Sequence, residues 1–175
     1  MSVQEIFSAV VAFDPGKVIE LVDRAERERL LLEQLTGLGD EYKYVFIDCP
    51  PSLGLLTLNA MVAAESIIVP MQCEYYALEG LGSLTHTLSL IQSSFNPSLE
   101  IEGIVLTMYD ARNTLSRQVA DEIKKHFGDK VYKTIIPRNI RLAEAPSFGK
   151  PILLYDATSK GAQSYMALAK EIMKN

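Results

Sequence analysis

Cysteine and histidine are scarce in this sequence of 175 residues, and their scarcity excludes several kinds of site. Two cysteines, Cys49 and Cys73, are too few for a disulfide framework and indicate reduced thiols in a cytoplasmic protein. His86 and His126 lie far apart in the sequence and have no partners at metal-ligand spacing. Ser52 lacks the G-x-S-x-G context of a hydrolase nucleophile. We therefore expect neither a structural metal site nor a serine-hydrolase centre.

Long apolar runs and an overall cationic excess are also missing. No apolar run reaches the roughly 18 residues of a membrane span, and no charged leader with a cleavage site opens the sequence, so we expect no membrane association. The net charge of −5 does not indicate a nucleic-acid binder as a whole. Residues 1–99 hold 5 Lys/Arg and 13 Asp/Glu, whereas residues 100–175 hold 12 and 9. The second half can carry a basic surface, although an ordinary solvated surface explains the same numbers.

Apolar segments of strand and helix type alternate along the chain. A hydrophobic content of 48% and a charged content of 22% are ordinary for a soluble globular domain, so we expect one domain over residues 1–175, with residues 1–18 of uncertain structure. The alternation predicts an α/β fold of three layers, a mostly parallel sheet flanked by helices. The predicted strands are 44–48, 66–70, 101–108 and 131–136, and the predicted helices are 23–36, 55–64, 78–93, 114–127 and 158–173.

The rest of the chain is organised around residues 44–48. This apolar run suits a strand buried on both faces, and it ends at Asp48 because Pro50 and Pro51 cannot continue a strand. An acid at the carboxyl end of such a strand holds Mg²⁺ in P-loop proteins, usually through water, and turn formation is the alternative role. The four strand ends predict one common edge of the sheet, formed by Asp48, Pro70, Tyr109-Asp110 and Pro137.

Three segments resemble the ParA/Soj family of chromosome- and plasmid-partitioning ATPases, which belongs with MinD to one wider group. Residues 47–60 resemble the Walker B and switch II segment, residues 72–80 a second family segment, and residues 136–147, followed by Gly149-Lys150-Pro151, a third. They occur in family order and at family spacing, and the resemblance covers roughly residues 19–175. It implies a fold like that of the P-loop NTPases.

The family's phosphate-binding loop, K-G-G-x-G-K-T-[ST], has no counterpart in the sequence. Gly16-Lys17 is followed by Val18, and Gly149-Lys150 is followed by Pro151, so neither pair fits the Walker A pattern. The sequence therefore resembles the C-terminal two-thirds of a ParA protein, truncated at the N-terminus. No catalytic residue is assigned, because the P-loop lysine is absent.

The resemblance implies a nucleotide site along the predicted sheet edge. Asp48 matches the Walker B acid, which fixes Mg²⁺ through water, and the turn that starts at Pro50 would report the γ-phosphate. Pro137 and Asn139 match the loop beside adenine, with an ordinary strand-to-helix turn as the alternative. The other candidate nucleotide-binding residues are Thr107, Met108 and Arg138.

The resemblance also implies a dimer face and a DNA-binding face. In the family ATP brings two subunits face to face, and the matching candidate contacts are Gln72, Glu74, Tyr75 and Tyr76. Simple coverage of the sheet edge is an equal alternative for the tyrosines. Family dimers bind DNA without sequence preference, and Arg112 and Arg141 match DNA-contacting positions.

These features predict a ParA/Soj-like partitioning protein of the bacterial cytoplasm, associated with the nucleoid. The implied cofactors are ATP and Mg²⁺, and the implied partners are a second copy or a full-length ParA-type protein, a ParB-type DNA-bound protein and non-specific DNA. We expect weak or absent ATP hydrolysis because Walker A is missing. The alternative is a non-enzymatic interaction module, or an inactive fragment, that pairs with a full-length ParA-type protein.

Overall fold

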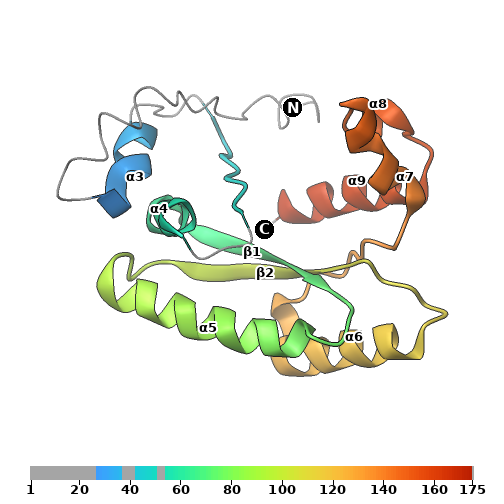
Figure 1. Cartoon of the computed structure of the whole chain (residues 1–175), viewed down its shortest axis with the longest axis horizontal. Coiled ribbons are helices and arrows are strands. Elements are labelled where there is room, and N and C mark those ends of the chain that lie inside the picture. Colours follow the sequence, from blue (N-terminus) through green and yellow to red (C-terminus); the bar gives the residue numbers. More distant parts are fainter. Residues whose placement is uncertain (1–26, 37–41, 51–53, 175) are drawn as a thin grey trace. The chain divides into compact units, whose positions relative to one another are not determined.

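The computed structural model describes residues 27–36, 42–50 and 54–174 (Figure 1). These residues form two compact units, one made of the described residues up to 67 together with 87–100, and one made of 68–86 and 101–174. The single domain expected from the sequence stays a prediction. In chain order the elements are η1 (Arg27–Arg29), α3 (Leu30–Leu35), α4 (Leu55–Ala63), β1 (Ser66–Gln72), α5 (Ala77–Ser94), β2 (Glu100–Thr107), α6 (Thr114–Phe127), η3 (Gly128–Lys130), α7 (Ile140–Glu144), η4 (Ala145–Phe148), α8 (Ile152–Tyr155) and α9 (Lys160–Ile172).

Two asparagines fasten the helices of the first unit. The Oδ1 atom of Asn59, which is buried in α4, accepts a hydrogen bond from the backbone N–H of Leu31 at 3.2 Å and so ties α3 to α4. Asn96 donates to three backbone carbonyls at the end of α4, at 2.8 to 3.3 Å. Because the last carbonyls of a helix have no partner within it, Asn96 satisfies groups that would otherwise need water.

The second unit is built around β1 and β2, which pair in a two-stranded sheet. The middle of β2 is a continuous apolar run and is buried, as a strand with covered faces requires. Figure 1 shows α6 on one side of the strands and α9 on the other. Val105 of β2 packs in a core cluster with Tyr132, Ile136 and Leu168. Strands with helices on both faces confirm the predicted α/β class.

Residues 131–136 lie beside β2 but do not form the predicted strand. The N–H of Tyr132 donates to the carbonyl of Ile104 at 2.9 Å, and the N–H of Ile136 donates to the carbonyl of Leu106 at 2.9 Å. The two donors, Tyr132 and Ile136, are four residues apart, whereas their acceptors in β2 are two residues apart. The extra residues of this segment form a bulge. Only isolated parallel bridges remain at the two ends of the segment.

The bulge has its own hydrogen-bond acceptor. The backbone N–H groups of Lys133 and Thr134 donate to the two carboxylate oxygens of Glu171 in α9, at 2.8 and 3.0 Å. The half-buried N–H of Thr134 needs a partner, and here the Glu171 side chain supplies it in place of a neighbouring strand. The apolar pattern of residues 131–136 predicted a strand. The strand does not form because the Glu171 carboxylate accepts the hydrogen bonds that a continuous ladder would have made.

The predicted strand at 44–48 is wrong as well. Residues 42–50 have no regular secondary structure, and no backbone hydrogen bond joins them to another residue in the part of the chain that the structure describes. Val45 and Phe46 are 38% and 50% exposed. A strand needs a hydrogen-bonded neighbour, so an apolar run alone does not make one.

The other elements follow the sequence closely. β1 continues two residues beyond Pro70 to Gln72, and α6 has the predicted bounds. The predicted closing helix begins after Ser159, whose hydroxyl accepts from the N–H of Ala162 at 3.2 Å. Residues 1–18 and the predicted helix start at 23 lie outside the described residues. Among the described helices, none is both long and apolar enough to cross a membrane.

Candidate functional site

Asp48 and Pro50, the predicted magnesium and switch residues, belong to the first unit and are both exposed. The hydroxyl of Thr57 in α4 donates to the carbonyl of Pro50 at 3.4 Å, a long hydrogen bond. Burial raises the pKa of the neighbouring Cys49 thiol, and the charge of Asp48 raises it further. Cys49 therefore stays protonated and is not an activated nucleophile.

A magnesium site made of protein side chains alone is not found in the described residues, where no three His, Cys, Asp or Glu side chains gather. Mg²⁺ commonly takes one or two carboxylates and fills its other positions with water and substrate phosphates. An exposed, single carboxylate such as Asp48 fits a site of that kind. Its metal role stays a prediction.

The end of β2 carries the candidate residues Thr107 and Met108. The carbonyl of Thr107 accepts from the N–H of Cys73 at 3.1 Å, which binds the segment after β1 to the end of β2. Met108 has a φ of 53°, in the left-handed region that residues other than glycine rarely adopt. Backbone strain of this kind is concentrated at functional sites.

The loop that follows the bulge is pinned to the same strand end. Tyr109 and Pro137 form a parallel bridge, and the N–H of Arg138 donates to the carbonyl of Tyr109 at 2.9 Å. Of the four predicted strand ends, those at Tyr109 and Pro137 are therefore adjacent within the second unit, whereas no strand ends at Asp48. The residues brought together are Thr107, Met108, Pro137, Arg138 and Asn139.

Asn139 caps α7, and this cap limits what its side chain can offer a ligand. Its Oδ1 accepts from the N–H of Leu142 at 3.3 Å, an N-cap bond that satisfies one unpaired donor of the helix. From the sequence we expected the amide both to give and to accept hydrogen bonds. The cap occupies one lone pair of the oxygen, so the amide NH₂ is the group most readily offered to a ligand.

Arg138 joins this loop to the predicted dimer face. Its guanidinium donates to the Glu74 carboxylate at 2.6 Å, and the two side chains are 54% and 53% exposed. Exposed pairs contribute little to stability, so this pair orients the two segments more than it stabilises them. Gln72, the last residue of β1, is also exposed.

Tyr75 and Tyr76 follow Glu74 directly. Their rings meet edge to face with centroids 5.2 Å apart, and they are 73% and 74% exposed. Tyrosines that covered a sheet edge would be largely buried. Their exposure favours the predicted contact role over that alternative.

Arg112, a predicted DNA contact, is held by Asp110. Its Nε and backbone N–H donate to Oδ1 at 3.0 Å, and its Nη2 lies 2.9 Å from Oδ2. These hydrogen bonds lower the pKa of Asp110 to about 2, so the pair stays ionised down to strongly acidic pH. The arginine side chain is nevertheless 91% exposed and presents its charge to solvent in a fixed direction.

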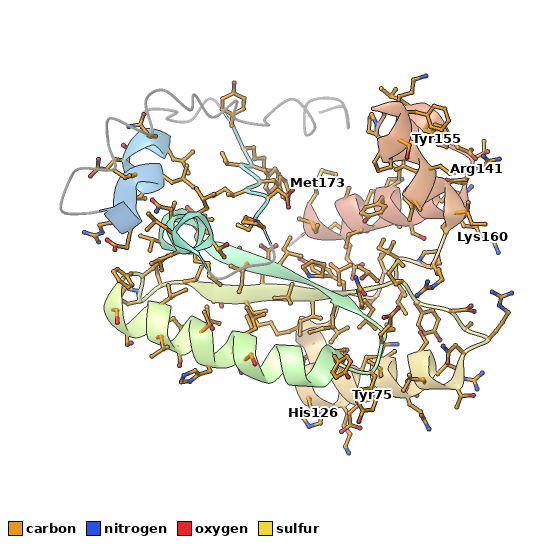
Figure 2. All side chains as sticks on the ribbon, viewed as in Figure 1. Tyr75, His126, Arg141, Tyr155, Lys160 and Met173 are labelled. Carbon is orange, nitrogen blue, oxygen red and sulfur yellow. The ribbon has the colours of Figure 1, made fainter. Side chains whose placement is uncertain are left out.

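Arg141, the second predicted DNA contact, is more fully neutralised. It lies 2.9 Å from a carboxylate oxygen of Glu144 and 3.5 Å from one of Asp156, and it is 54% exposed. The Tyr155 hydroxyl donates to the same Glu144 oxygen at 3.1 Å, and Figure 2 shows Arg141 and Tyr155 on the same side of the α7–α8 region. Sequence spacing could have found Glu144, three residues away on a helix, but not Asp156.

Comparisons with known proteins decide the family. A family profile described as an AAA domain matches residues 11–101. The chromosome partitioning protein ParA of Myxococcus xanthus is 55% identical over 159 residues, which are 91% of this chain and 56% of that protein. The chromosome-partitioning ATPase Soj of Treponema pallidum is 49% identical over 172 residues, 98% of this chain and 68% of that protein. The chain belongs to the ParA/Soj family.

This ParA/Soj-family chain spans only part of most relatives. The sporulation initiation inhibitor protein Soj of Bacillus subtilis is 57% identical over 160 residues, which are 91% of this chain and 63% of that protein. The family resemblance drawn from three sequence segments is confirmed.

Solved structures show the same fold. A cobyrinic acid a,c-diamide synthase of Mycobacterium smegmatis, with bound ATP analog and magnesium, matches with a TM-score of 0.72 and 38% identity, over 91% of this chain and 59% of that one. The cell division ATPase MinD of Pyrococcus furiosus matches with a TM-score of 0.67 and 27% identity, over 84% of this chain and 58% of that one. Both support the P-loop NTPase-like α/β class.

Proposed function

We propose that this chain acts in chromosome or plasmid partitioning as a ParA/Soj-type protein. In this function ATP pairs two copies, the pair binds DNA without sequence preference, and a ParB-type DNA-bound protein stimulates hydrolysis. The observation that carries the proposal is an arrangement in the second unit. The loop of residues 137–139, the exposed tyrosines and Arg112 lie near the ends of β1 and β2. The identity to partitioning proteins over about 90% of the chain supports it. Its place of action is the bacterial cytoplasm, on the nucleoid.

The residues at the end of β2 and in the loop 137–139 fit the base of ATP. Pro137 offers an apolar face and Asn139 an amide donor to the base, while Met108 is held in a strained conformation beside them. Asp48 would hold Mg²⁺ through water, and the metal supplies charge neutralisation to the phosphates when bound. Pro137 and Asn139 would orient the base, and none of the residues named here moves a proton.

ATP hydrolysis by these 175 residues alone is weak or absent. Phosphoryl transfer depends on groups that position the phosphates and stabilise charge, and the sequence contains no G-x-x-x-x-G-K-[ST] motif to do so. A steady-state assay of phosphate release, with DNA and a ParB-type protein present, tests this. Turnover that depends on Mg²⁺ and is lost in Asp48→Ala would overturn it.

DNA binding can be tested separately. Arg112→Ala should weaken binding to a random duplex. The slope of log K against log salt concentration should become shallower by about one, because one phosphate contact is lost. Arg141→Ala should have a smaller effect, because two carboxylates already neutralise that side chain. Equal effects of the two substitutions would contradict this assignment.

A second candidate function is a non-enzymatic module that pairs with a full-length ParA-type protein. The exposed pair Tyr75–Tyr76 favours it, since aromatic side chains are enriched in interface cores. Co-purification with a full-length relative, lost in Tyr75→Ala/Tyr76→Ala, would support this function. Retention of the complex in that variant would argue against it.

A further inference from the structure

An apolar groove lies between α4 and the second half of α5, within the first unit. It measures about 520 Å³, and its large apolar lining side chains are Leu55, Leu58, Leu90, Ile91 and Phe95. Leu55, Leu90 and Phe95 are 41%, 54% and 37% exposed, although they line the same groove. No charged side chain of a described residue contributes to the lining. A concave apolar surface of this kind marks an interaction site.

The two helices that form the groove are fastened to each other. Asn96, which directly follows Phe95, donates to three backbone carbonyls at the end of α4. The side-chain amide of Gln92 donates to the carbonyl of Leu99 at 2.6 Å and fixes the turn after α5. A groove whose walls are already ordered loses little freedom when a segment docks into it.

The groove suits an uncharged occupant, because a charge moved from water into an apolar site without a partner costs free energy. Residues 6–13, which precede the described part of the chain, read Ile-Phe-Ser-Ala-Val-Val-Ala-Phe and contain no charge. Ile6, Val10 and Phe13 recur at the spacing of one helix face, as in helical segments that fill apolar grooves. A helix of eight residues is about 12 Å long, close to the roughly 14 Å of the nine residues of α4.

The same segment is joined to the groove by a short length of chain. Arg27 begins η1, and both η1 and α3 contact α4, one wall of the groove. The 13 residues between Phe13 and Arg27 span up to about 45 Å when extended, about three times the length of α4. A segment on a linker of this length meets its site at an effective concentration on the order of 1 mM.

We propose that residues 6–13 dock as a short helix into the groove between α4 and α5 of their own chain. The phosphates of nucleic acid are unsuited to a lining without charge. Two copies that apposed their grooves would leave both unfilled, and a segment of another protein would have to displace one that is already tethered. This inference goes beyond the partitioning function and does not depend on it.

A disulfide formed within one chain tests the proposal directly. In a Cys49→Ser background, which removes the exposed thiol, mild oxidation should close the Val10→Cys/Leu90→Cys pair at least about tenfold faster than Val10→Cys/Ser89→Cys. Ser89 is the matched control, because it is exposed on α5 beside Leu90 and does not line the groove. Electrophoresis without reductant measures both rates. Equal rates would overturn the proposal, and a cross-link mainly between chains would assign the groove to a second copy.

A labelled peptide of residues 4–14, followed by fluorescence anisotropy, tests the occupancy of the groove. Val10→Asp/Phe13→Asp should free the groove, and this variant should bind the peptide at least about tenfold more tightly than the wild type does. Adding Leu90→Asp should remove that binding, whereas adding Ser89→Asp should leave it unchanged.

Two results with the peptide would contradict the proposal. Absence of binding to the freed groove, or binding that ignores Leu90→Asp, would show that residues 6–13 do not fit it. Equal binding by the wild type and by Val10→Asp/Phe13→Asp would show that the groove is open to a segment of another protein. If the aspartate variant fails to fold, the two cysteine pairs decide alone.

Discussion

Residues 42–50 and 131–139 were both expected to contain a strand, and in each the predicted strand is followed by proline. The second segment is tied to β2 by two backbone hydrogen bonds, by the Tyr109–Pro137 bridge and by Glu171. The first segment is joined to α4 by the long 3.4 Å bond from the Thr57 hydroxyl to its last carbonyl, and no backbone hydrogen bond links it to another described residue. Its apolar side chains remain partly exposed.

The contrast between the two segments shows that an apolar run joins a sheet only where hydrogen-bond acceptors lie beside its N–H groups. The loop around Pro137 and Asn139, the proposed contact to the base, is therefore fixed within the second unit. The predicted metal side, at Asp48, has no comparable support from described residues. Substitutions on the two sides should therefore differ in their effect on the free energy of unfolding.

The largest effect is expected at Gly103 in β2, against which the bulged segment packs. A Cβ at this position would overlap the buried ring of Tyr132, meeting Cε2 and lying 2.7 Å from Cζ. Gly103→Ala should cost about 2–3 kcal/mol in urea unfolding, as overpacking does, and less in a Tyr132→Leu background. Gly80→Ala is the control, because nothing lies within 4 Å and a helical alanine should stabilise slightly. An unchanged midpoint in Gly103→Ala would show that the segment is not packed on β2.

Glu171 should come next, because it replaces the missing strand. Glu171→Ala removes the charged acceptor of a part-buried N–H (Thr134) and of an exposed one (Lys133) and should cost about 1–3 kcal/mol, with Glu171→Gln costing less because one oxygen remains. Urea unfolding of both variants measures the difference.

The same carboxylate should make stability depend on pH. Burial raises the pKa of Glu171, but hydrogen bonds from Thr134 and Lys133 outweigh it, so the pKa lies below its usual value. Its stabilisation is therefore complete above the unfolded-state pKa and is lost as the pH falls through the lower folded-state pKa. Parallel stability–pH curves for wild type and Glu171→Gln would contradict this role.

Asn139 should have a smaller effect on stability. Asn139→Ala removes the N-cap of α7 and should cost about 1 kcal/mol, as Asn113→Ala should for the equivalent cap of α6. Urea unfolding compares the two. A cost confined to Asn113 would show that α7 does not depend on its cap.

The smallest effect is expected at Asp48. Asp48→Asn should change the free energy of unfolding by less than about 0.5 kcal/mol, because the side chain is exposed. A loss comparable to that of Glu171→Ala would mean that this segment is held as firmly as residues 131–139, and the contrast between them would fail.

Elements with their own periodic pattern could be predicted from the sequence. The bounds of α6 follow from its buried stripe of Val119, Ala120 and Ile123 and from the stop at Gly128. The bulge could not be predicted, because Glu171 is 37 residues from Thr134. The helices α7 and α8, of five and four residues, are too short to show a period. Met108 carried no sequence signal for its positive φ.

Calorimetric titration of the chain with ADP and ATP, with and without Mg²⁺, tests most directly the proposal that residues 137–139 are held ready for the base while Asp48 lacks comparable support. We predict that any binding is unaffected by Mg²⁺, with a dissociation constant no lower than about 1 mM, or about −4 kcal/mol. Micromolar binding that requires Mg²⁺ and is lost in Asp48→Asn would contradict the claim. It would mean that these 175 residues hold the phosphates and the metal as well as the base.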